Sequence, residues 1–339
     1  MTAKVKFKAA GPGLYAGSLA VALLLAAPAP ARAFLFGGES YKKAGALLGE
    51  MNAAFERGEC VTVLEKAGKF FGEKPPAEMR EEAYGYTGRC YEAAGSTDKA
   101  IGIYKLARGL YPDNSLFAYR LALIYNQSGF PANAVPLFIK VLAVYPDDIG
   151  ANLGLARAYA VLGFLAKAGD YYSRAVILQD FKDGPVLKEY AFCMLKKRDW
   201  NEVLFAAGKG AQAGPGLAAW PLLEARVSAG RGDYYKALTS IESAILLEPS
   251  RHLRLERALY LLLAGLPRRA ITAADAELLL DKADPLAALV KGMALYNLGD
   301  KAGSAEYFIR AGAGEPFTAK IAASFFGVPA KSEGDSCKK

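Results

Sequence analysis

The chain has little of what most enzyme active sites need. Its 339 residues include a single histidine, His252, and four cysteines, none of which forms a Cys-x-x-Cys pair. These counts argue against histidine-based acid–base catalysis, zinc sites with several histidines, and thioredoxin-like redox sites. Metalloprotease, nucleophile-elbow, phosphate-loop and dinucleotide-binding motifs are also missing. The sequence therefore predicts a chain that is not an enzyme and that uses no metal and no cofactor.

A strong charge of one sign is missing once the first 33 residues are set apart. The formal net charge is +8, and four of these positive charges belong to Lys4, Lys6, Lys8 and Arg32, which no acidic residue accompanies. Eight minus four leaves +4 for the remaining chain, which has no dense basic stripe with interleaved aromatic residues. We therefore expect no nucleic-acid partner.

Long hydrophobic runs are missing too, except for one near the N-terminus. Residues 18–27 (SLAVALLLAA) follow three lysines and precede the small-residue site Ala31-Arg32-Ala33. This order is typical of a bacterial secretory signal peptide, so we expect cleavage near Ala33 and a periplasmic or secreted mature protein. The run is shorter than the roughly 20 residues that cross a bilayer, so no transmembrane segment is expected in the mature chain. An uncleaved N-terminal anchor is the alternative.

The sequence does contain a repeat of 34 residues. Small, aromatic and proline residues from Gly88 to Pro112 follow one another at steps of 3, 4, 5, 4, 3 and 5. The same steps recur from Ala122 to Pro146, 34 residues further on. A period of this length indicates stacked helical hairpins, so the sequence predicts an all-α fold.

This pattern resembles the tetratricopeptide repeat (TPR) family, and about eight copies can be placed over residues 44–318. The resemblance implies a right-handed superhelical solenoid of helical hairpins. It also implies small residues where two helices approach closely, as at Ala100 and Ala134, and a glycine at the turn within a hairpin. The fourth copy has Asp180 where a proline would end it. The first copy is degenerate, and the fifth copy, residues 184–217, fits the pattern weakly.

The two ends of the chain are predicted to differ from the array. After the signal peptide at residues 1–33, we expect a flexible N-terminus at residues 34–43. The last apolar face of a solenoid must be covered or made polar, so residues 319–327 are interpreted as a capping helix. Residues 328–339 contain proline, glycine, serine and mixed charge, and we expect a disordered tail there.

The resemblance places the binding surface in a concave groove lined by the first helix of each hairpin. Arg89, Arg120 and Arg157 fall in consecutive copies, so they could hold an acidic or carboxylate-bearing segment together. The alternative is that the groove side chains pack between hairpins or only keep the surface soluble. The candidate groove residues, many of them types that are common at interfaces, are Asn52, Phe55, Tyr86, Arg89, Tyr119, Arg120, Asn126, Arg157, Lys188, Phe192, Arg226, Met293 and Tyr296.

Resemblance to exported TPR proteins implies a non-catalytic interaction scaffold of the bacterial cell envelope, which binds a peptide segment or helix of a protein partner. The alternative is an accessory or regulatory subunit of an envelope enzyme complex, such as a polysaccharide synthase or export machine. Acidic pairs such as Glu81-Glu82 are interpreted as helix-start carboxylates without a catalytic role. The Lys-Asn-Asn-Lys-Arg carboxylate clamp of some family members is not reproduced in this sequence.

Cys60 and Cys90 are the two cysteines that could pair. The repeat register places Cys60 early in the second helix of the first copy and Cys90 late in the first helix of the next copy. These helices should be antiparallel neighbours, which could bring the cysteines within disulfide distance. The alternative is two ordinary buried thiols. We expect Cys193 and Cys337 to be unpaired.

Overall fold

The computed structural model describes residues 38–312, and every regular element within that range is an α-helix. The all-α prediction is therefore confirmed for this part of the chain. The predicted signal peptide, capping helix and tail lie outside the described residues, as does Cys337. The chain divides into two compact units, with the boundary between Ser128 and Gly129. The right-handed superhelix stays a prediction.

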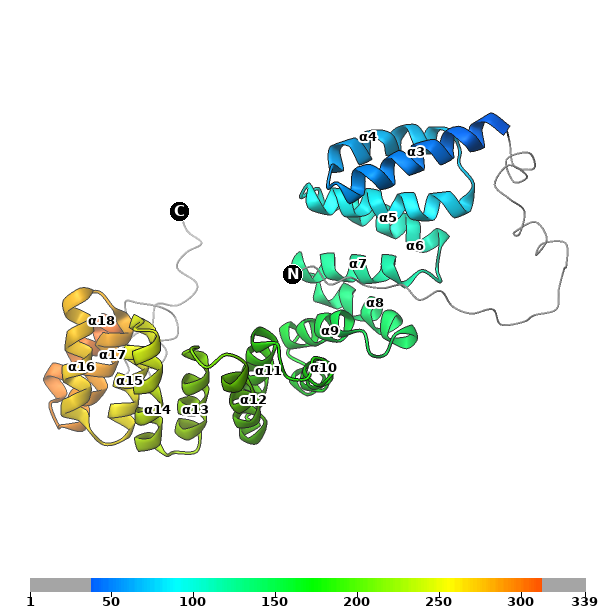
Figure 1. Ribbon diagram of the computed structural model, residues 1–339. Coiled ribbons are helices and arrows are strands. Elements are labelled where there is room, and N and C mark those ends of the chain that lie inside the picture. Colours follow the sequence, from blue (N-terminus) through cyan, green and yellow to red (C-terminus); the bar gives the residue numbers. More distant parts are fainter. Residues whose placement is uncertain (1–37, 313–339) are drawn as a thin grey trace. The chain divides into compact units, whose positions relative to one another are not determined.

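The N-terminal unit contains five described helices that pack in chain order, with the first two paired as a hairpin (Figure 1). Its first and third helices also contact each other directly. The helices are α3 (Gly38–Glu56), α4 (Cys60–Gly72), α5 (Ala77–Ala93), α6 (Thr97–Leu110) and α7 (Ser115–Gln127).

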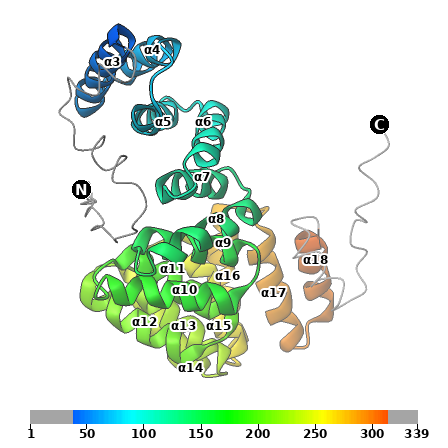
Figure 2. The ribbon, with the colours of Figure 1, turned by 90° about the vertical axis from the view of Figure 1, so that its right-hand side faces the viewer.

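The C-terminal unit contains eleven described helices, and within this unit consecutive helices pack against each other (Figure 2). Such a stack of nearest neighbours is what an array of repeats produces. The helices are α8 (Pro131–Val144), α9 (Ile149–Val161), α10 (Leu165–Leu178), α11 (Gly184–Lys197), α12 (Trp200–Ala213), α13 (Ala219–Gly230), α14 (Tyr234–Leu247), α15 (Arg251–Leu263), α16 (Pro267–Leu280), α17 (Pro285–Asn297) and α18 (Lys301–Gly312). None of the helices between residues 38 and 312 is both long and apolar enough to cross a membrane.

Small residues lie where the repeat pattern requires close helix contacts. Ala100 and Ala134 are fully buried, and so are the equivalent alanines of α10, α14 and α16. Gly88 of α5 faces the buried ring of Tyr104, and a Cβ atom at this glycine would lie 2.4 Å from the ring. A larger side chain would therefore force α5 and α6 apart within their hairpin.

The turns within hairpins depend on residues with positive φ. Glycines such as Gly95 (φ 66°) and Gly232 (φ 82°) occupy this position in most copies, because glycine has no Cβ to clash in the left-handed region. In the fifth copy, Arg198 adopts the same conformation with a φ of 63°. Asp180 and Phe181 also have positive φ, 57° and 55°. Both departures coincide with the places where the sequence leaves the repeat pattern.

The array begins earlier than the repeat pattern indicates. Residues 38–43, part of the segment expected to be flexible, form the first turns of α3. The Ser40 hydroxyl donates a hydrogen bond of 2.7 Å to the Glu73 carbonyl oxygen, and Ala44 is already fully buried. Packing against the end of α4 therefore extends the helix beyond its apolar repeat positions.

Candidate functional site

The candidate groove residues all lie on odd-numbered helices, the first helix of each copy, but they are divided between the two units. In the N-terminal unit they are Asn52 and Phe55 on α3, Tyr86 and Arg89 on α5, and Tyr119, Arg120 and Asn126 on α7. In the C-terminal unit they are Arg157 on α9, Lys188 and Phe192 on α11, Arg226 on α13, and Met293 and Tyr296 on α17.

Four of the candidates form a cluster between α3 and α5. The rings of Tyr86 and Phe55 lie 4.9 Å apart between centroids, and the Arg89 guanidinium carbon is 4.5 Å from the Phe55 centroid. The Tyr86 hydroxyl donates to the Glu82 carboxylate and lies 3.0 Å from Asn52 Oδ1. Burial and the negative charge of Glu82 raise the pKa of Tyr86, so the phenol remains protonated. The sequence predicts none of these contacts individually.

A cleft of about 300 Å³ opens beside this cluster, between α5 and the start of α7. It lies within the N-terminal unit and combines a carboxylate rim with an aromatic and aliphatic wall. Asn114, the N-cap of α7, donates a 2.8 Å hydrogen bond to Glu81 and thereby ties the two helices together at the cleft. The residues that line the cleft are Glu78, Glu81, Glu82, Gly85, Tyr86, Arg89, Asn114, Leu116 and Phe117.

The three glutamates of this cleft are the functional candidates that the sequence analysis missed. The sequence pattern explains Glu81 and Glu82 only as helix-start carboxylates and assigns no role to Glu78. Their spacing carries a signal, because Glu78, Glu82, Tyr86 and Arg89 follow one another at steps of four, four and three and so share one face of α5. The helix-dipole interpretation of Glu81-Glu82 is therefore incomplete, since both side chains also line the cleft.

Arg120 has a carboxylate partner of its own. It lies 3.7 Å from Glu92 of α5, and about a quarter of each side chain is exposed. The hydroxyl of Tyr104 donates to the same carboxylate. Burial and the charge of Glu92 raise the pKa of Tyr104. This group therefore connects three helices of the N-terminal unit rather than presenting an unpaired arginine.

Arg157, in the C-terminal unit, is also paired. Its guanidinium donates two hydrogen bonds of 2.7 Å to the Glu189 carboxylate on α11, and the Tyr172 hydroxyl donates to Glu189 at 3.1 Å. The hydrogen bonds to Glu189 raise the pKa of Arg157 against the opposing effect of burial. Arg120 and Arg157 each have a carboxylate partner within the chain, and a site shared by the three arginines stays a prediction.

Arg226 repeats this arrangement two copies further along the chain. It donates two 2.9 Å hydrogen bonds to Glu256 of α15 and lies 5.8 Å from the ring centroid of Phe192. Tyr260 donates to Glu256 at 2.6 Å. Burial would raise the pKa of Glu256, but the hydrogen bonds from Arg226 and Tyr260 outweigh it and lower this pKa. His252 Nε2 is 3.3 Å from an Arg226 nitrogen.

The remaining candidates have different roles. Lys188 is exposed on α11. Met293 packs against two buried clusters of the C-terminal unit, so it contributes mainly to the core. Tyr296 is 40% exposed on α17. Tyr119 and Asn126 both lie on α7.

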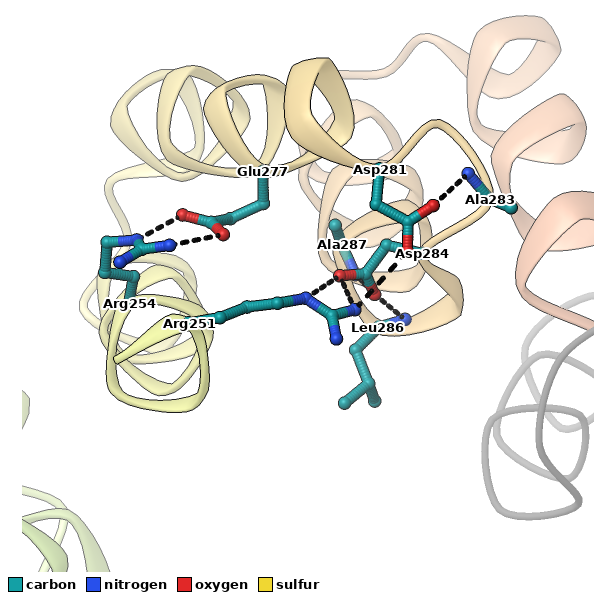
Figure 3. Close-up of polar contacts among 8 residues, drawn as sticks. All are labelled: Arg251, Arg254, Glu277, Asp281, Ala283, Asp284, Leu286 and Ala287. Carbon is teal, nitrogen blue, oxygen red and sulfur yellow. Dashed lines mark hydrogen bonds and ion pairs between the residues drawn. The ribbon is translucent and has the colours of Figure 1, made fainter. Parts of the chain in front are cut away.

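Two further ion pairs join α15 to the helices that follow it (Figure 3). Asp284 is completely buried, accepts hydrogen bonds from the first backbone N–H groups of α17, and pairs with Arg251. Arg254 donates two hydrogen bonds of 2.6 and 3.1 Å to the nearly buried Glu277. Both carboxylates have hydrogen-bond partners within the chain, so this group ties α15 to α16 and to the start of α17 and offers no site for a ligand.

Cys60 and Cys90 are joined by a disulfide, with their Cα atoms 5.0 Å apart. The bond links the start of α4 to the end of α5 and therefore fastens the first hairpin to the second. Cys193 is buried as a free thiol. Between residues 38 and 312, no group of three histidine, cysteine or acidic residues is arranged to hold a metal ion.

Comparisons with known proteins agree with this architecture. Residues 119–185 match the family model described as tetratricopeptide repeat. A tetratricopeptide repeat protein from Parabacteroides merdae ATCC 43184 superposes with a TM-score of 0.55 at 16% identity, over 76% of this chain and 95% of the other. At this identity the likeness shows the fold alone.

Two shorter solved structures are also similar. YrrB, described as a TPR protein with an unusual peptide-binding site, has 20% identity and a TM-score of 0.48 over 50% of this chain and 88% of its own. MamA has 20% identity and a TM-score of 0.45 over 48% and 94%. No curated protein has a matching sequence. Residues 119–185 thus match the tetratricopeptide repeat family, and the described hairpins share the fold of a solved tetratricopeptide repeat protein.

Proposed function

We propose that this chain is a non-catalytic interaction scaffold that holds a segment of a protein partner against α3, α5 and α7 of its N-terminal unit. The cleft beside Tyr86 carries this proposal. It has the mixed apolar and polar lining that peptide sites require. The adjoining Phe55 and Arg89 side chains, of types common at binding hot spots, extend the surface onto α3.

We further propose that the scaffold works in the bacterial cell envelope, after export and cleavage near Ala33. The N-terminal sequence pattern supports export. The disulfide between Cys60 and Cys90 supports an oxidising compartment, because such bonds are rare in the reducing cytosol. N-terminal sequencing of the protein from a periplasmic fraction tests this proposal. A chain that still begins at Met1, or that is found only in the cytosol, would contradict it.

The binding proposal is tested by affinity capture from an envelope extract with the chain starting after Ala33. The Phe55→Ala/Tyr86→Ala double variant should lose the captured partner, because both rings of the cluster are removed. Tyr235→Ala is the matched control, since this tyrosine is 66% exposed on α14 of the other unit. Equal capture by the wild type and the double variant would exclude the cluster as the binding surface.

The identity of the captured protein distinguishes the two envelope roles. A polysaccharide synthase or export protein would favour an accessory subunit of an enzyme complex. Assembly or secretion proteins would favour a scaffold that acts outside any one enzyme.

A further inference from the structure

The cleft of the N-terminal unit carries a surplus of negative charge. Glu78, Glu81 and Glu82 line it against the single cation of Arg89. Among the described residues, none of these three carboxylates forms an ion pair with lysine, arginine or histidine. Glu56, at the end of α3, is near enough to add to the negative field at Tyr86.

At the other groove arginines, by contrast, the negative charge of a nearby carboxylate is balanced by the arginine. Arg120, Arg157 and Arg226 each face a carboxylate within hydrogen-bonding or ion-pair distance. The register explains why the cleft differs. In the C-terminal unit, Arg157 pairs with a glutamate 32 residues further on, and Arg226 with one 30 residues further on. The residue 31 positions after Arg89 is Arg120, so Arg89 has no such partner.

The remaining wall of the cleft is apolar. Leu116, Phe117 and the ring of Tyr86 form it, and Gly85 has open space where a side chain would lie. A ligand that fits this surface must offer both hydrocarbon and positive charge. Lysine and arginine side chains do so, because their long aliphatic stems can cover apolar surface while the charged group stays among carboxylates.

We propose that this cleft, in its proposed role as a binding site for a partner segment, selects an extended segment bearing lysine or arginine. The basic side chain lies over the wall formed by Tyr86 and Leu116, and its charge meets the glutamates at the rim. The ligand preference is therefore opposite to the acidic segment expected from the arginines alone. The choice depends on which carboxylates have no cationic side chain in ion-pair contact, and only the folded N-terminal unit shows this.

The probes are three short fluorescent peptides that share alternating leucines and differ only in lysine, glutamine or glutamate at the intervening positions. Binding to the disulfide-intact chain is measured by fluorescence anisotropy. The lysine peptide should bind about tenfold more tightly than the glutamine peptide, as a few exposed charge contacts allow. The glutamate peptide should bind most weakly. Raising the salt concentration should reduce these differences, because exposed charges are screened.

Two triple variants locate the effect. Glu78→Gln/Glu81→Gln/Glu82→Gln should abolish the preference for lysine, while the glutamine oxygens can still accept the hydrogen bonds from Asn114 and Tyr86. The matched control removes three exposed carboxylates from the C-terminal unit, none of which forms an ion pair among the described residues. It is Glu224→Gln/Glu242→Gln/Glu306→Gln.

The outcomes separate this inference from the binding proposal on which it rests. Equal affinity for the lysine and glutamine peptides, together with loss of both on Phe55→Ala/Tyr86→Ala, would overturn the inference and keep the binding site. If the control triple variant lost the preference for the lysine peptide to the same extent, the preference would come from non-specific charge attraction. This result would also overturn the inference. Failure of all three peptides to bind would overturn both proposals.

Discussion

Reduction of the bond between Cys60 and Cys90 should loosen the first hairpin, and it does so without removing any side chain. The bond spans 30 residues of chain. In the chain-entropy model, closing a loop of this length restricts the unfolded state by about 3.6 kcal/mol. The hairpin formed by α3 and α4 has a neighbour on only one side among the described helices, α5. It therefore depends on the bond more than an interior hairpin would.

Hydrogen exchange measures this effect helix by helix. Reduction can lower the free energy of local opening of this hairpin by at most the whole entropic contribution of the bond. Amides of α3 and α4 should then exchange up to about 400-fold faster after reduction. Amides of α13 and α14 are the internal control, because no disulfide reaches them. Cys193→Ala is the matched variant, since it removes a buried cysteine that takes no part in the bond.

Two results would refute this reasoning. Free alkylation of Cys60 and Cys90 in the unreduced exported protein would show that the bond does not form. Unchanged exchange of α3 and α4 after reduction would show that packing alone holds the hairpin. If the reasoning holds, reduction should also weaken peptide binding, because Asn52 and Phe55 are positioned by α3.

Two further predictions concern packing and pH. Gly88→Ala should destabilise the N-terminal unit by about 1–3 kcal/mol, because the new Cβ would collide with the Tyr104 ring. Gly102→Ala, on an open face of α6, should instead stabilise it by about 0.5–1 kcal/mol. Urea unfolding should therefore give changes in unfolding free energy of opposite sign for the two variants. Equal changes would contradict the predicted contact between residue 88 and Tyr104. The pKa of Glu256 is lowered below its unfolded value of 4.5, so its pairing with Arg226 stabilises the fold above that pH and is lost as pH falls through the folded value. The stability difference between the wild type and Glu256→Gln should therefore shrink on acidification below pH 4.5, and a constant difference would contradict this assignment.

Much of the fold follows from the order of residues alone. The 34-residue steps predict where helices begin and end, because each hairpin packs mainly against its neighbours in sequence. Small residues such as Ala100 and Ala134 are buried where the register puts them. The weak fifth copy is also visible in the sequence, and its turn uses Arg198 in a conformation usually reserved for glycine. Sequence position predicts these features because they depend on backbone geometry and side-chain size.

The sequence could not decide which charges remain available at the surface. Arg89 and Arg157 occupy equivalent positions, yet Arg157 donates to Glu189 while Arg89 stacks on Phe55. The difference depends on the side chain that the next hairpin brings within reach, and on the length and direction of both partners. Those relations exist only after the hairpins pack. The repeat pattern therefore predicts a surface lined by arginine and aromatic residues, whereas the tertiary structure of the N-terminal unit makes its cleft acidic.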